Sequence, residues 1–148
     1  MIHFEKIPQD VFIRLEDVKK LLNDDANVIF AYLFGGLAKG TVTPLSDIDI
    51  ALYCRHYDAD YVMNVFVKLC EVCNTSEIDL VMLNTAPVAL AGRIVSQKKV
   101  IVDKEPFIRH SFESLTLRKY FDFSIKEKLI LYRRYGIGKY STDFKKNT

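Results

Sequence analysis

The chain has 148 residues, 49% of them hydrophobic, and a formal net charge of +2. This length suffices for one domain with a hydrophobic core and is too short for two ordinary domains, so we expect a single domain over residues 1–140 followed by a flexible polar tail over 141–148. The apolar stretches are only as long as strands, and the N-terminus lacks the apolar core of a signal peptide. Both features indicate a soluble, cytoplasmic protein without a membrane-spanning segment.

Charge is distributed unevenly along the chain. Residues 1–92 carry 7 Lys or Arg against 13 Asp or Glu, whereas residues 93–148 carry 14 against 6. The basic part could offer a surface to nucleotide phosphates, nucleic acid or an acidic partner, or could simply be a solvated helix face. Three cysteines, an odd number, argue against a disulfide framework. We interpret Cys70 and Cys73 as core residues, because no second ligand pair accompanies them.

The first half of the chain predicts two strands and two helices. Asp10 is typical of an N-cap, and helical spacing of apolar residues continues to about Asn23. Residues 28–34 are short, apolar and rich in β-forming types, which predicts a buried strand ending at the Gly35-Gly36 turn. A second strand over residues 47–53 and an amphipathic helix over residues 57–72 follow.

The second half continues with a strand over residues 77–83, a helix over 88–96 and a strand over 99–103. A long helical segment from Glu105 ends at Gly136 and Gly138. Its expected apolar anchors are Leu115, Leu117, Phe121, Ile125, Leu129, Ile130 and Tyr132. The short first connection favours a hairpin, and the later crossover allows either strand direction. We therefore predict an α/β (α+β) fold in which helices pack on a small mixed sheet, with a C-terminal helical segment.

Three carboxylates fall at positions that can share one metal site. Successive side chains of a strand point to opposite faces, so Asp47 and Asp49 lie on one face while Ile48 and Ile50 fill the other. Asp79 repeats this pattern in its own strand and can join the pair if the strands are neighbours. Oxygen ligands and phosphates suit a hard cation such as Mg²⁺, and two ions about 3.5–4 Å apart could clamp the attacking and leaving oxygens of a displacement.

A glycine turn stands one strand upstream of these carboxylates. Gly35 and Gly36 let the backbone approach a ligand closely, and a helix opening after them would direct free N–H groups at phosphates. Lys39 adds a positive charge nearby, and Ser46 directly precedes the first carboxylate. The combination predicts metal-assisted chemistry on a nucleoside triphosphate.

These residues resemble the signature of the nucleotidyltransferase superfamily, which is Gly-Ser, about ten residues, Asp-x-Asp and a later strand carboxylate. Gly35-Gly36, Asp47-Ile48-Asp49 and Asp79 occupy those places, with Gly36 where the family usually has serine. The small size and the C-terminal segment are similar to minimal nucleotidyltransferases, or MNT proteins, which include antitoxins paired with HEPN-domain toxins.

The resemblance implies a fold like that of DNA polymerase β and a Mg²⁺-dependent transfer of AMP from ATP to a hydroxyl group. It implies that Asp47 and Asp49 hold two Mg²⁺ ions, that Asp79 joins them and helps to activate the acceptor, and that Gly35, Gly36, Lys39 and Ser46 bind the nucleotide. The implied acceptor is a tyrosine of a partner HEPN toxin, which the transfer would silence.

Two further functions stay open at this stage. A nucleotidyltransferase fold with weak triphosphate binding could neutralise its partner by masking it. Alternatively, an acidic pocket could accept a small cationic molecule such as an aminoglycoside. Nucleic acid is a possible acceptor through the basic half of the chain, but the resemblance does not favour it.

Overall fold

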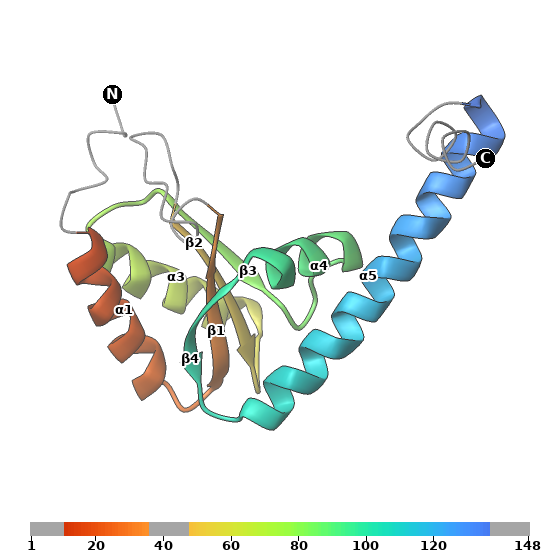
Figure 1. The fold of residues 1–148 in the computed structure, drawn as a ribbon. Helices are drawn as coiled ribbons and strands as arrows, with labels where there is room; N and C mark the ends of the chain where they lie inside the picture. Colours follow the sequence, from red (N-terminus) through yellow and green to blue (C-terminus); the bar gives the residue numbers. More distant parts are fainter. Residues whose placement is uncertain (1–10, 36–47, 137–148) are drawn as a thin grey trace.

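The computed structural model describes residues 11–35 and 48–136, which form a four-stranded sheet with helices on both faces (Figure 1). The strands are β1 (Val28–Phe34), β2 (Ile48–Cys54), β3 (Ile78–Met82) and β4 (Lys99–Asp103), in the spatial order β3-β2-β1-β4. β1 pairs antiparallel with β2 and with β4, while β2 and β3 are parallel. The predicted mixed sheet is therefore confirmed.

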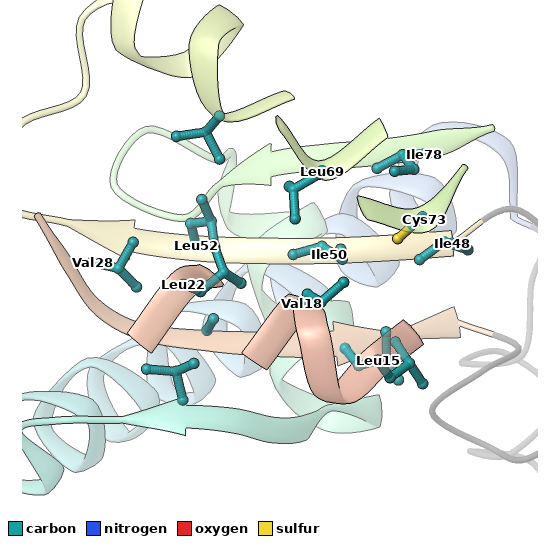
Figure 2. Close-up of a cluster of buried hydrophobic side chains, with 14 of the residues drawn as sticks. Leu15, Val18, Leu22, Val28, Ile48, Ile50, Leu52, Leu69, Cys73 and Ile78 are labelled. Atoms are coloured by element: carbon teal, nitrogen blue, oxygen red, sulfur yellow. The ribbon is translucent and has the colours of Figure 1, made fainter. Parts of the chain in front are cut away.

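Helices α1 (Val11–Asp24) and α3 (Ala59–Cys73) cover one face of the sheet. Their apolar stripes meet alternate residues of the strands, and Figure 2 shows Val18 and Leu22 of α1 and Leu69 of α3 beside Ile50 and Leu52 of β2. These side chains are at most 1% exposed. The face opposite to the predicted carboxylates is thus the larger part of the hydrophobic core.

Local signals in the sequence set the ends of α3. The Asp58 carboxylate accepts a hydrogen bond of 2.8 Å from the backbone N–H of Tyr61, which satisfies a free donor of the first turn. Asn74 ends the helix in the left-handed conformation at φ 55° and donates its N–H to the carbonyls of Cys70 and Glu71. Inside α3, burial raises the pKa of Cys73 to about 11 and also raises that of Cys70. Both thiols therefore stay protonated near neutral pH, as packing residues do.

Helices α4 (Val88–Gln97) and α5 (Pro106–Tyr135) lie against the other face. Tyr32 and Ala51 from the sheet and Ile94 and Val95 of α4 form the centre of this second cluster. Tyr120 of α5 sits directly on Gly92 of α4, where a Cβ would lie 2.2 Å from the ring carbon Cγ. Only a glycine allows this close approach of the two helices.

Gly92→Ala is expected to lower the free energy of unfolding by about 1–3 kcal/mol, because the added methyl group overlaps the ring of Tyr120 and this outweighs the better helix propensity of alanine. Urea denaturation measures the change. In a Tyr120→Ala background the same substitution is expected to be neutral or stabilising. An equal loss in both backgrounds would show that the Tyr120 contact does not restrict residue 92.

The expected apolar anchors of α5 are only partly correct. Leu115, Leu117, Phe121, Ile125, Ile130 and Tyr132 were expected to pack, yet each is between 38% and 66% exposed. The physical reason is visible in Figure 1, where the later turns of α5 stand away from the sheet and from α4. Phe112 and Tyr120, on the side of α5 that faces the domain, are partly buried. No helix within residues 11–35 and 48–136 combines the length and apolar character that crossing a bilayer requires.

Candidate active site

The candidate site lies where β1 ends and β2 begins. Gly35 directly follows the last residue of β1 and has a φ of +71°, a left-handed conformation that favours glycine. Its neighbour Phe34 pairs with Asp49 of β2. A Cβ built on Gly35 would lie only 2.1 Å from Oδ2 of Asp49. The carboxylate of Asp49 therefore rests against the backbone of the predicted glycine turn.

Asp49 and Asp79 are brought together by the parallel pairing of β2 and β3. They are direct partners in the register, as are Ile48 with Ile78 and Ile50 with Leu80. In a parallel pair, side chains at the same register position point to the same face. The flanking isoleucines belong to the core under α1 and α3, so both carboxylates face the side on which α4 and α5 lie. Asp49 is half-buried and Asp79, on an edge strand, is exposed.

Several predicted site residues lie outside the described residues, namely Gly36, Lys39, Ser46 and Asp47. Within residues 11–35 and 48–136, no three His, Cys, Asp or Glu side chains are grouped to hold a metal ion. The two carboxylates that the structure places, those of Asp49 and Asp79, offer only oxygen atoms as ligands, which is what Mg²⁺ prefers. The placed part of the site is thus Gly35, Asp49 and Asp79.

Sequence reasoning did not find a polar cluster that links α5 to the same face of the sheet. The hydroxyl of Tyr32 donates a hydrogen bond of 2.6 Å to Oε2 of Glu113. Arg109 contacts the same oxygen at 3.1 Å and Asp103 at 3.0 Å, and Lys98 lies 3.5 Å from Glu113. The spacing of Arg109 and Glu113, four residues apart on a helix, was the only signal of this cluster in the sequence.

The cluster shifts the pKa values of Tyr32 and Glu113. Burial and the hydrogen bond to Glu113 raise the pKa of Tyr32, so its hydroxyl stays a donor. Burial alone would raise the pKa of Glu113, but the hydrogen bonds from Tyr32 and Arg109 and the charge of Lys98 outweigh it and hold that pKa below its ordinary value. Tyr32 lies on β1 two residues before Phe34, so the cluster ties the start of α5 to the strand that leads into Gly35.

Glu113→Gln is expected to lower the free energy of unfolding by about 1–3 kcal/mol at pH 7, since it removes the charge that Arg109 and Lys98 share. A depressed carboxyl pKa stabilises the fold above the unfolded value of about 4.3 and stops doing so as the pH falls through the folded value. The difference between wild type and variant should therefore shrink below about pH 4. Denaturant unfolding at pH 7 and at about pH 3 tests this. Glu127→Gln, on the exposed part of α5, is the control. An equal difference at both pH values would contradict it.

A cavity lined by described residues lies away from the carboxylates. It measures about 430 Å³ and is lined by Asp25, Tyr61 and Lys68 among others, next to the beginning of β1. Gly35 is at the opposite end of that strand. We therefore place the candidate site by its carboxylates and its glycine, not by cavity size.

Solved structures share this fold. A chain in the crystal structure of a toxin–antitoxin complex with AMP-PNP is 27% identical with a TM-score of 0.69, over 79% of this chain and 94% of that one. A chain in a MntA–HpeT toxin–antitoxin complex with a tyrosine-to-alanine mutation is also 27% identical, with a TM-score of 0.67 over 78% and 93%. A chain in the complex of a tri-AMPylated Shewanella oneidensis HEPN toxin with an MNT antitoxin is 24% identical. Its TM-score is 0.65, and the match covers 81% of this chain and 94% of that one.

The sequence itself points to the same fold. No curated protein matches the chain in a sequence search. Residues 16–107, which run from α1 to the start of α5 and include Gly35, Asp49 and Asp79, match the family described as polymerase beta, nucleotidyltransferase. This match spans more than half of the chain. The protein belongs to the polymerase beta nucleotidyltransferase family.

Proposed function

We propose that the protein is an antitoxin that transfers AMP from ATP to a hydroxyl group, a tyrosine, of a HEPN-family toxin. The observation that carries the proposal is the pairing of Asp49 with Asp79 beside Gly35 in a chain of this family. It is supported by the likeness to the toxin–antitoxin complex with AMP-PNP. The AMPylated HEPN toxin seen with an MNT antitoxin of the same fold suggests the acceptor.

In the proposed reaction, the acceptor oxygen attacks the α-phosphorus of ATP. An oxygen–phosphorus bond forms, the bond from the α-phosphorus to the bridging oxygen breaks, and pyrophosphate leaves. Asp79, exposed on the edge strand, is the group we assign to take up the hydroxyl proton. A reaction of this kind needs positioning and charge neutralisation more than covalent help from the protein.

Asp49, Asp79 and, in the same motif, Asp47 are the residues that we assign to hold Mg²⁺. Mg²⁺ held by these residues would neutralise triphosphate charge and help to orient the acceptor hydroxyl toward the α-phosphorus. Gly35 and Gly36 would offer backbone N–H groups to the phosphates, and Lys39 and Ser46 would add a positive charge and a hydroxyl. Mg²⁺ dependence, tested by adding EDTA, is part of this proposal.

Mass spectrometry of the toxin after co-expression tests the acceptor. The HEPN-family toxin of the proposed pair is purified from cells that express it with wild type or with Asp49→Asn. We expect AMP adducts on a tyrosine peptide of the toxin with wild type and none with the variant. A toxin that carries no adduct but is still neutralised by Asp49→Asn would favour masking, and an adduct on an added aminoglycoside alone would favour a small-molecule acceptor.

A further inference from the structure

The second half of α5 exposes many large apolar side chains to solvent. After Tyr120, which packs on Gly92, no residue of this helix is buried. Large apolar side chains that are 42–66% exposed continue along this part, at Phe121, Phe123, Ile125, Ile130, Leu131 and Tyr135. They point to different sides of the helix, since residues 121 and 130 are about half a turn apart in direction. A helix that is apolar on several sides is normally enclosed by other protein.

This part of the helix is also basic. Residues 121–135 contain four Lys or Arg, at positions 126, 128, 133 and 134, and two acidic residues, Asp122 and Glu127, while Arg118 and Lys119 lie just before them. A surface that complements it therefore combines apolar side chains with carboxylates. A second copy of this chain fits poorly, because two segments that each carry a net charge of +2, with two further basic residues next to them, would be placed side by side.

The direction of α5 carries this surface toward the end of the molecule that holds the candidate site. Figure 1 shows α5 rising away from the sheet toward the end of the molecule at which β1 ends. The carboxylates of Asp49 and Asp79 lie at that end and face the side of the sheet on which α5 begins. A protein that spans from the outer turns of α5 to the sheet would have its hydroxyl groups on the side of the candidate site.

We infer that residues 121–135 of α5 are the docking arm that captures the acceptor protein. The surface of the acceptor protein that contacts this arm is apolar at its centre and acidic at its rim. The inference rests on the proposed function for the identity of that protein, the HEPN toxin. Docking on α5 leaves the carboxylate site open to ATP while the acceptor is held.

Binding is measured without ATP by isothermal titration of the full chain into the HEPN-family toxin of the proposed pair. Phe121→Glu and Ile130→Glu are each expected to raise the Kd by about 30-fold or more, because each buries a carboxylate in the apolar centre of the interface. Met63→Glu is the matched control, since Met63 of α3 is 61% exposed, close to the 66% of Phe121, but lies on the opposite face of the domain. It should bind like wild type.

A second variant keeps the test independent of local folding. Lys126→Glu combined with Lys128→Glu leaves the apolar surface intact, and it should weaken binding to the acidic rim and reduce the salt dependence of the Kd. Wild-type affinity in both glutamate variants of the apolar residues, no complex with wild type, or a dimer of this chain alone that Phe121→Glu dissociates would each overturn the docking arm. Loss of binding in these variants supports the docking arm even if no AMP is transferred. If the variants bind the toxin as tightly as wild type and still transfer AMP, the docking arm is wrong and the proposed function stands.

Discussion

Asp49→Asn is expected to lower the rate of AMP transfer by about 100-fold or more without lowering the melting temperature. The amide has nearly the size of the carboxylate but lacks its charge. It therefore fits beside Gly35 but is no longer an anionic ligand for Mg²⁺. It also removes the repulsion between the paired residues 49 and 79. The rate is measured with labelled ATP and purified toxin under single-turnover conditions.

Asp17→Asn is the control for this substitution, because Asp17 is an exposed aspartate of α1 on the other face of the sheet. It should transfer AMP like wild type. If Asp49→Asn kept more than about a tenth of the wild-type rate, Asp49 could not be a metal ligand of the reaction.

Gly35→Ala is the second substitution with a large expected effect. Alanine at φ +71° costs about 1–2 kcal/mol of stability, and its Cβ would meet Oδ2 of Asp49 at 2.1 Å. The end of the Asp49 side chain can move aside, so the protein should still fold. A shift of about 1 Å in a group that orients the reaction can cost about 100-fold in rate, and we expect a loss of that size.

Gly136→Ala separates these two effects. Gly136 caps α5 at a similar φ of +64°, but no atom of residues 11–35 or 48–136 lies within 4 Å of a Cβ built there. It should show the loss of stability without the loss of AMP transfer. Equal activity of Gly35→Ala and Gly136→Ala would contradict the role of Gly35 in seating Asp49.

Much of the fold was predictable because its signals are local. The strands were predicted to within a residue or two from their apolar runs, and Asp49 and Asp79 were placed on one face by the alternation of side chains along a strand. Their direct pairing could not be predicted, because strand order and register depend on contacts between distant segments.

The sequence was misleading for α5 for a related reason. In the sequence, an apolar residue such as Phe121 looks the same whether its side chain packs inside its own chain or is exposed. Only the direction of the helix, which the sequence does not give, distinguishes the two cases. The contacts of Tyr32 with Glu113 were likewise hidden, since 81 residues separate the two in the chain.

The central claim is transfer of the AMP part of ATP to a partner protein at Asp49 and Asp79. The most direct measurement compares ATP labelled at the α-phosphate with ATP labelled at the γ-phosphate, each incubated with the wild-type chain, Mg²⁺ and the HEPN-family toxin of the proposed pair. Label on the toxin from the α-phosphate only, lost in Asp49→Asn, is the predicted result. Label from the γ-phosphate on the toxin would contradict the account. So would the absence of α-phosphate label on a toxin that binds the wild-type chain.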